Sequence, residues 1–230
     1  MTEIAPVDPL RPERSGAALA AAERALRDGG LVVMPTETVY GIACRPDDAA
    51  ATDRLFEAKA RPRDLNLAIL TATPEEALAL VAGNPFADAL ALRLWPGPLT
   101  MVLPRGERSL AWALGRDPAS VGVRVPDLPV SRALLARTGP LAVTSANRSG
   151  EPPAETTDEL VSAFGDSVAV YLTVAAGAAT GSGAPSTVID LTDPPRIRQL
   201  RAGALTGKHL AAALDASGPE PEWVDFPPWR

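Results

Sequence analysis

Short apolar runs alternate along this chain with segments of helical periodicity, and turn-forming residues separate the two kinds. Bounded apolar runs of this length are typical of strands buried within a sheet. The predicted strands cover residues 31–34, 67–71, 99–103, 121–125, 141–144, 168–172, 186–191 and 196–200, and the sequence PTETVYGI at 35–42 leads into a further extended piece.

Helix start and stop signals flank the periodic segments. The clearest is TPEE at 73–76, which combines a capping box with proline at the first helical position. The predicted helices run from Ser15 to the glycines at 29 and 30, from Asp47 or Asp48 to Lys59, from 73, over 86–94, from 129, over 157–164 and from 206.

Interleaved strands and helices predict an α/β fold, with a twisted, largely buried mixed sheet flanked by helices. No linker divides the chain, so we expect one domain over residues 15–215. An extended leader at 1–14 precedes it and a tail rich in proline and tryptophan follows at 216–230. Because its aromatic residues favour burial, we expect the tail to dock on the body or on a partner.

Charge and cysteine content narrow the classes of function. The chain has 22 Lys and Arg against 28 Asp and Glu, so it has no general basic surface for nucleic acid, although a local basic groove stays open. One cysteine, Cys44, and one histidine, His209, exclude a disulfide framework and a Cys/His zinc site. With no signal peptide and no apolar stretch of membrane-spanning length, we expect a soluble cytoplasmic protein.

Common nucleotide signatures are not met. GALTGKH at 203–209 is too short between its glycines for a P-loop and lacks the following hydroxyl residue, and GSG at 181–183 lacks the third glycine of a dinucleotide fingerprint. Any nucleotide site must therefore rest on other residues.

Two polar motifs each allow two interpretations. Lys59 and Arg61, in KARP at 59–62, either complement a helix dipole or hold a polyphosphate. SANRSG at 145–150 is either an ordinary turn or a ligand site at the carboxyl end of a strand.

Arg124 lies within the apolar strand VGVRVP, and a buried arginine requires an anionic partner. The alternative is that Arg124 faces solvent or an internal carboxylate. Cys44 has no histidine near it in the sequence and is expected to be a small core residue.

In chain order, PTETVYGI, KARP, LWPGPLTMVL, VGVRVP, TSANRSG, STVIDL and LRAG resemble the motifs of the YrdC/Sua5 family of threonylcarbamoyl-AMP synthases over about residues 29–203. The KxR signature of the family is present as Lys59 and Arg61, and SxN as Ser145 and Asn147. Two positions depart from the pattern: LNL at 65–67 replaces the common Asn-Pro-Leu, and Ser120 stands where threonine is common. The short tail resembles that of single-domain members.

The resemblance implies a YrdC-like sheet with a concave ligand groove. There a nucleotidyltransferase converts L-threonine, bicarbonate and ATP with Mg²⁺ into L-threonylcarbamoyladenylate and pyrophosphate. A downstream threonylcarbamoyl-transferase complex then completes the t6A37 modification of ANN-reading tRNAs. The implied threonine contacts are Thr36, Tyr40, Asn66, Arg124, Ser145 and Ser186; the implied ATP contacts are Lys59, Arg61, Ser120, Asn147 and Arg201; the implied catalytic residues are Lys59, Arg61 and Arg124. No resident metal site is expected.

The chemistry implied by the resemblance joins two anions, so cations must neutralise them. We expect Lys59, Arg61 and Arg201 around the triphosphate and Arg124 gripping the threonine carboxylate with two hydrogen bonds. No general base is evident, and the Gly/Ser-rich stretch at 177–185 is a candidate lid. The alternative function is a module that binds structured RNA in ribosome or tRNA maturation. A carbamoyl-transfer domain of the hydrogenase-maturation kind is less favoured, because those chains are longer and carry Cys-rich zinc motifs.

Overall fold

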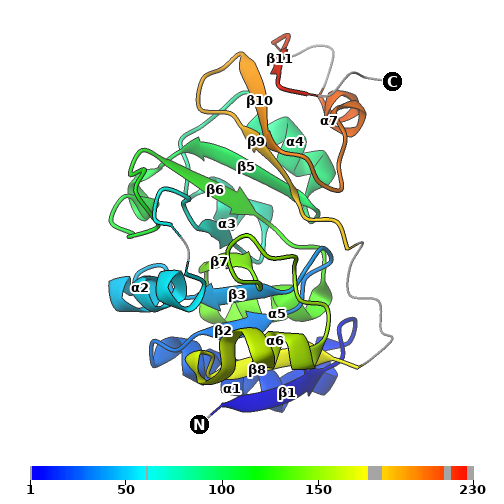
Figure 1. Cartoon of the computed structure of the whole chain (residues 1–230). Coiled ribbons are helices and arrows are strands. Elements are labelled where there is room, and N and C mark those ends of the chain that lie inside the picture. The colour runs from blue at the N-terminus through cyan, green and yellow to red at the C-terminus, as the bar shows by residue number, and fades with distance from the viewer. Residues whose placement is uncertain (1, 61, 176–182, 215–218, 227–230) are drawn as a thin grey trace.

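The computed structural model describes residues 2–60, 62–175, 183–214 and 219–226. Within these residues, eleven strands form one mixed sheet in the order β1-β8-β2-β3-β7-β4-β6-β5-β9-β10-β11 (Figure 1). The strands are β1 Glu3–Val7, β2 Val32–Met34, β3 Gly41–Cys44, β4 Ala68–Leu70, β5 Leu99–Pro104, β6 Ser120–Arg124, β7 Leu141–Ser145, β8 Val170–Val174, β9 Thr187–Asp190, β10 Arg196–Arg201 and β11 Glu222–Val224. The predicted twisted mixed sheet flanked by helices is therefore confirmed.

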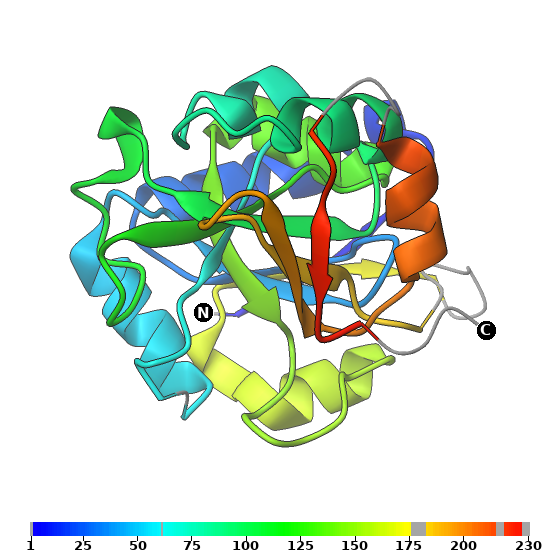
Figure 2. The ribbon, with the colours of Figure 1, turned by 90° about the horizontal axis from the view of Figure 1, so that it is seen from above.

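The helices cover both faces of the sheet. They are α1 Gly16–Arg27, α2 Ala49–Ala58, α3 Pro74–Leu78, α4 Ala87–Leu94, α5 Pro129–Thr138, α6 Thr157–Phe164 and α7 Gly207–Ala213, with short 3-10 turns at Pro12–Ser15, Glu107–Ser109 and Gly165–Ser167. Helix α6 lies on the opposite side of the sheet from α1 and α5 (Figure 2).

Two buried apolar clusters lie on opposite faces of the sheet. One contains side chains of α1 and α5, and the other contains side chains of α2, α4, α6 and α7. Strand β2 contributes to both, because Val32 and Met34 belong to the first cluster and Val33 to the second. Alternate residues of a strand point to opposite faces, so a strand covered on both sides is apolar throughout.

Local capping explains several helix starts. Asp48 begins α2 by accepting a hydrogen bond from the Ala51 amide, and Thr156 and Glu159 form a reciprocal capping box at α6. The start of α3 differs from the prediction: Thr73 accepts from the Glu76 amide, but the Glu76 carboxylate accepts from Ala72 rather than from Thr73.

Both terminal segments enter the sheet. Residues 1–14, predicted to be an extended leader, contain β1, which pairs in parallel with β8. The predicted tail contains β11, which pairs in parallel with β10, and the rings of Trp223 and Phe226 meet edge to face at 5.1 Å. These strands form the two edges of the sheet (Figure 1). The division of the chain at residues 15 and 215 stays a prediction.

Strand pairing brings distant motifs together. The loop at 35–40 joins β2 to β3, and Gly41 at its end pairs with Ser145 of β7. On the other half of the sheet, Arg124 of β6 pairs with Leu70, and Leu99 of β5 pairs with Thr187. Among the described helices, none is long and apolar enough to cross a membrane.

Candidate active site

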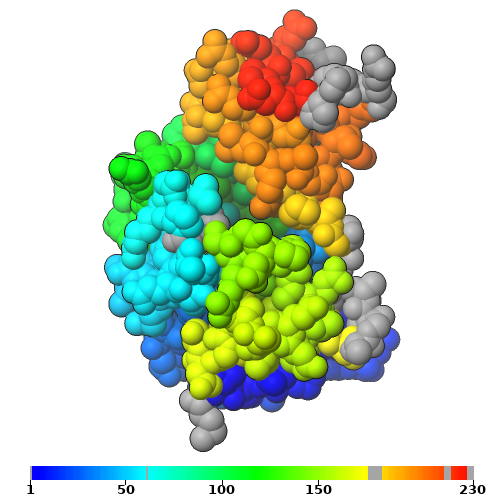
Figure 3. All heavy atoms as spheres, viewed as in Figure 1, coloured from blue at the N-terminus to red at the C-terminus, as the bar shows by residue number. Residues whose placement is uncertain are grey.

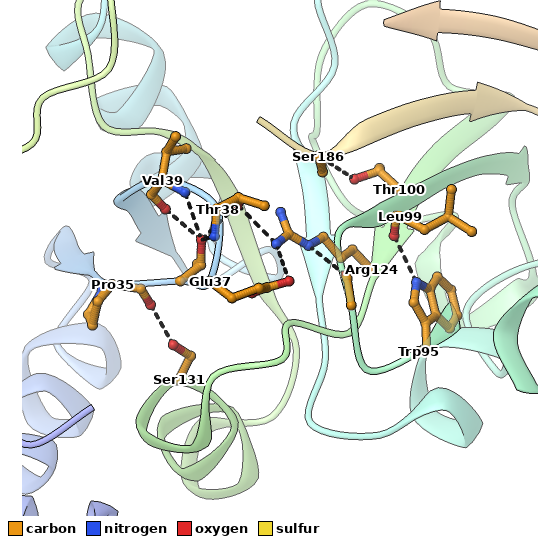
Figure 4. A network of polar contacts seen from close by, with 12 residues as sticks. Pro35, Glu37, Thr38, Val39, Trp95, Leu99, Thr100, Arg124, Ser131 and Ser186 are labelled. Carbon is orange, nitrogen blue, oxygen red and sulfur yellow. Dashed lines mark hydrogen bonds and ion pairs between the residues drawn. The ribbon is translucent and has the colours of Figure 1, made fainter. Parts of the chain in front are cut away.

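Arg124 is the centre of a buried polar network (Figure 4). Its Nε donates to the carbonyl of Gly97 at 3.2 Å, and its Nη2 donates to Glu37 Oε1 at 2.6 Å and to Thr38 Oγ1 at 3.0 Å. The Arg124 side chain is only 7% exposed. The alternative of an internal carboxylate partner is therefore confirmed.

This network leaves one end of the guanidinium open. Among the residues that the structure describes, the Nη1 group of Arg124 has no hydrogen-bond partner. The edge formed by Nε and Nη2, however, is filled by protein acceptors. A ligand carboxylate that takes two hydrogen bonds from Arg124, as the sequence predicts, must therefore use Nη1 together with an Nη2 that now serves Glu37.

The hydroxyls of the 35–40 loop are also joined to one another. Thr36 Oγ1 lies 2.9 Å from Thr38 Oγ1 and bonds to the carbonyl of Val39. Ser131 of α5 donates to the carbonyl of Pro35 and so fastens the beginning of the loop. The loop is therefore held in shape around Arg124 from within and from α5.

A second cluster joins the KxR and SxN motifs. Lys59 follows α2 and is 1% exposed, and its Nζ donates to the carbonyls of Ser145 and Asn147 at 2.5 Å each and to Asn147 Oδ1 at 3.2 Å. Ser145 Oγ donates to the same Asn147 Oδ1. The segment after β7 lies directly against the end of α2, yellow-green against cyan in Figure 3. Lys59 therefore fixes the shape of the Ser145–Asn147 turn as well as bringing a positive charge.

A third cluster contains Ser186 and Arg201. Ser186 Oγ lies 2.9 Å from Thr100 Oγ1, and the guanidinium of Arg201 donates to the carbonyl and hydroxyl oxygens of Ser186. Ser186 is buried, whereas Arg201 is exposed. Gly203 packs so closely on the backbone of residues 185–187 that no side chain fits there. Strand β10 thus positions Ser186 beside Thr100.

A fourth cluster lies at the beginning of β6. Asn66 Nδ2 donates to the carbonyl of Asp117 at 2.8 Å, its Oδ1 accepts from the Asp117 amide, and Ser120 Oγ donates to the Asp117 carboxylate. Beside it is a hollow of about 440 Å³ lined by Arg63, Asp64, Gly115 and Arg116. The hydrogen bonds from Ser120 and from the Ala119 amide hold the pKa of Asp117 below its usual value, so its carboxylate is ionised at neutral pH.

Two of these clusters, those of Ser120 and Arg124, share one face of the sheet. Ser120 and Arg124 are four residues apart on β6, so their side chains project from the same face about 13 Å apart. Between them Gly122 has no side chain, and the side chains of Thr100, Ala68 and Val102 lie within 4 Å of where its Cβ would be. A glycine therefore separates Ser120, on the predicted ATP side, from Arg124, on the predicted threonine side.

Backbone hydrogen bonds connect the clusters around Arg124. The amide of Ala146 donates to the carbonyl of Tyr40 at 2.7 Å, which ties the 35–40 loop to the SxN turn. The amide of Gly97 donates to Val125, and the amide of Thr187 donates to Pro98. Residues 97–98 therefore link Arg124 to the Ser186 cluster.

Tyr40, a predicted threonine contact, has its hydroxyl engaged within the protein. The side chain is 5% exposed and its hydroxyl accepts from the Val174 amide at 3.2 Å. Burial raises the pKa of this phenol, and the Val174 hydrogen bond only partly opposes the shift. Tyr40 therefore joins the loop to β8 as a neutral phenol.

Two predicted features lie outside the described residues. Arg61 of the KxR motif is one, and most of the predicted lid at 177–185 is the other. Cys44 is fully buried, and burial raises the pKa of its thiol to about 12, which agrees with a core residue and not with a nucleophile.

Four residues of the site were not among the sequence candidates: Glu37, Thr38, Thr100 and Asp117. Glu37 and Thr38 stand within the PTETVYG motif, so the motif itself was the available signal. Nothing in the sequence shows that Glu37 meets Arg124, because 87 positions separate them.

The fold and the site define an α/β protein with buried polar clusters around Arg124 and Lys59 on a mixed sheet. The model of the Sua5/YciO/YrdC family, described as "Telomere recombination", matches residues 24–203. The chain belongs to this family.

Relatives extend the match to nearly the whole chain. A putative threonylcarbamoyl-AMP synthase of Mycobacterium tuberculosis is 40% identical over 216 residues, which cover 93% of this chain and 96% of that protein. The threonylcarbamoyl-AMP synthase of Marinobacter nauticus is 36% identical over 185 residues, 78% of this chain and 94% of that protein.

Solved structures agree with the fold. P. abyssi Sua5 complexed with L-threonine matches with a TM-score of 0.78 at 31% identity over 93% of this chain, which spans 61% of that longer chain. E. coli YciO matches with a TM-score of 0.78 at 24% identity, covering 89% of this chain and 97% of that chain, and supports the fold alone.

Proposed function

We propose that the protein is a threonylcarbamoyl-AMP synthase, a nucleotidyltransferase that forms L-threonylcarbamoyladenylate and pyrophosphate from L-threonine, bicarbonate and ATP. The names of the relatives favour this function over the RNA-binding alternative. The observation that carries it is Arg124, a buried guanidinium whose Nη2 contacts the hydroxyl of Thr38 and whose Nη1 has no partner among the described residues. That group suits the carboxylate of an amino acid.

The reaction requires two steps at neighbouring positions. The amine of threonine takes up CO₂ derived from bicarbonate to give a carbamate, and a carbamate oxygen then attacks the α-phosphorus as pyrophosphate leaves. Both reactants are anions, so the main tasks of the protein are alignment and neutralisation of charge.

On the threonine side, Arg124 holds the carboxylate, while Thr36, Ser145 and Ser186 supply hydroxyls that orient the substrate. Each hydroxyl is already fixed by a neighbour: Thr36 by Thr38, Ser145 by Asn147, and Ser186 by Arg201. Preformed hydroxyls position a ligand without the cost of ordering them during the reaction. Tyr40 and Asn66 act indirectly: Tyr40 holds the 35–40 loop, and Asn66 holds the start of β6.

On the ATP side, we assign the nucleotide to Lys59, Arg61, Ser120, Asn147 and Arg201. Lys59 acts there through the Ser145–Asn147 turn that its three hydrogen bonds hold. Mg²⁺ enters as the companion of the triphosphate, as part of the substrate, where it neutralises phosphate charge. Ser120 and Arg124 project from the same face of β6, so the triphosphate and the carbamate would meet on that face.

The product is then used by a threonylcarbamoyl-transferase complex that modifies adenosine 37 of tRNA. We also propose that the protein is cytoplasmic and makes a weak direct contact with tRNA. Neither is needed for the first step, because all three substrates are small molecules.

The test is pyrophosphate release by the purified protein with ATP, Mg²⁺, bicarbonate and L-threonine. We expect release only when threonine and bicarbonate are both present, and little release with L-alanine, which lacks the hydroxyl. No release under any condition, together with tight, salt-sensitive binding of structured RNA, would instead establish the RNA-binding module.

A further inference from the structure

The two carboxylate oxygens of Glu37 differ in their hydrogen bonding. Its Oε1 accepts from Arg124 Nη2 at 2.6 Å. Its Oε2 is buried and has no hydrogen-bond partner among the described residues. A buried carboxylate oxygen without a donor is costly, so an oxygen of this kind at a ligand site indicates a donor that arrives with the ligand.

The ion pair also limits what can bind to Arg124. The side chains of Glu37 and Arg124 are 18% and 7% exposed, so both charges are largely removed from water. A ligand with only a negative charge would draw Arg124 away from Glu37 and leave that carboxylate buried without a counter-charge. Breaking a buried pair in this way is strongly unfavourable.

A zwitterion avoids this cost. We propose that the amino-acid substrate inserts between Arg124 and Glu37, with its carboxylate on Arg124 and its α-ammonium on Glu37 Oε2. Each buried charge then has an opposite charge both before and after binding. This inference rests on the proposed function, because it takes Arg124 as the carboxylate site.

The surroundings of the pair fit such an exchange. Arg124 stays anchored through Nε to Gly97 and through Nη2 to Thr38 if Glu37 releases it. The 35–40 loop stays fastened by Ser131 and by the Thr36–Thr38 contact, neither of which involves the Glu37 side chain. Only the Glu37 carboxylate changes its partner, from Arg124 to the α-ammonium group of the ligand.

Glu37 therefore selects for an α-ammonium group next to the carboxylate. The corresponding α-hydroxy acid, (2S,3R)-2,3-dihydroxybutanoate, has the carboxylate and the β-hydroxyl of threonine but no ammonium group. It leaves Glu37 without a counter-charge. An ionic hydrogen bond of this kind corresponds to a preference of about tenfold to a hundredfold.

The experiment is a pair of calorimetric titrations, with L-threonine and with (2S,3R)-2,3-dihydroxybutanoate, on the wild-type protein and on Glu37→Gln. We expect wild type to bind threonine about tenfold to a hundredfold more tightly than the hydroxy acid. In Glu37→Gln, which keeps the size and one oxygen of the side chain, the two affinities should approach each other. Glu13→Gln, an exposed change in the turn before α1, should keep the wild-type preference.

The ratio of affinities separates this role from a purely structural one. If Glu37 only holds Arg124 in place, Glu37→Gln weakens the binding of both ligands equally. The preference for threonine over the hydroxy acid would then remain, which would overturn the inference. Equal binding of the two ligands to wild type would overturn it without any variant. Failure of wild type to bind threonine at all would instead contradict the proposed function.

Discussion

Arg124 and Glu37 form a buried ion pair of 2.6 Å that joins the end of β6 to the loop between β2 and β3. The arginine therefore has an internal carboxylate partner, and its Nη1 group has no partner among the residues that the structure describes. The site is thus neutral before its ligand arrives, and this neutrality shapes what removal of either partner does.

Removing Arg124 should damage both binding and stability. Arg124→Ala leaves the Glu37 carboxylate buried without a counter-charge, and we expect a loss of about 3–5 kcal/mol in the free energy of unfolding. Threonine binding should fall below detection because its carboxylate loses its partner. Urea unfolding and calorimetric titration measure the two effects separately.

The double variant Arg124→Met with Glu37→Gln is the control for that prediction. It removes both charges, so most of the stability should return while threonine binding stays lost. Unaltered threonine affinity in folded Arg124→Ala protein would contradict the role of Arg124.

Lys59 should be needed for turnover through the turn that it holds. Lys59→Met keeps the length of the side chain but removes the hydrogen bonds that Nζ donates to the carbonyls of Ser145 and Asn147. We expect pyrophosphate release to fall by at least about a hundredfold, in line with the loss of charge stabilisation at a phosphoryl-transfer site. Lys208→Met, on the exposed face of α7, should behave as wild type. Near-normal turnover in Lys59→Met would show that neither its charge nor the turn matters.

Gly203 should tolerate no side chain. An added Cβ would overlap the backbone of residues 185–187, which carries Ser186. We expect Gly203→Ala to lower the free energy of unfolding by about 1–3 kcal/mol and to reduce threonine affinity by moving Ser186. Gly83→Ala is the matched control, because nothing lies within 4 Å of a Cβ at that position. Equal stability of the two variants would show that the backbone of residues 185–187 can move to accommodate the added methyl group.

Cys44 should make stability depend on alkaline pH. Burial, aided by the nearby Asp48, raises the pKa of its thiol from 9.0 to about 12 in the folded protein. The folded state therefore holds the thiol proton more tightly than the unfolded state. The resulting stability is fully present below pH 9 and is lost as pH rises towards 12.

Urea unfolding of wild type and Cys44→Ala between pH 8 and pH 11 checks this effect. Tyrosines titrate in the same range, since burial raises the pKa of Tyr171 to about 12 as well. The difference between the two proteins isolates the thiol, and wild type should lose stability more steeply. Parallel curves would show that the Cys44 thiol is not perturbed.

Much of the interior could be predicted from the sequence, because the relevant signals are local. The apolar run at 31–34 contains β2, and Asp48 caps α2 as one of the two predicted positions. Strands β1 and β11 were missed for a physical reason: each lies at an edge and owes its pairing to a neighbour distant in the sequence. Edge strands of few residues carry little hydrophobic pattern of their own.

The partners of the site residues could not be predicted from the sequence either. Single residues such as Arg124 and Lys59 stand out by type and context, but their partners depend on long-range contacts. Lys59 donates to Ser145, 86 positions away, and Arg124 pairs with Glu37, 87 positions away. Sequence motifs therefore indicated which segments form the site, and the structure was needed to show which atoms satisfy one another.

The central claim is tested most directly by following the carbon of bicarbonate. The purified protein is incubated with ATP, Mg²⁺, L-threonine and ¹³C-bicarbonate, and the nucleotide products are analysed by mass spectrometry. We predict threonylcarbamoyladenylate with the label in its carbamoyl carbon, formed together with pyrophosphate. A folded protein that binds threonine and ATP yet yields no labelled adenylate would contradict the proposed function.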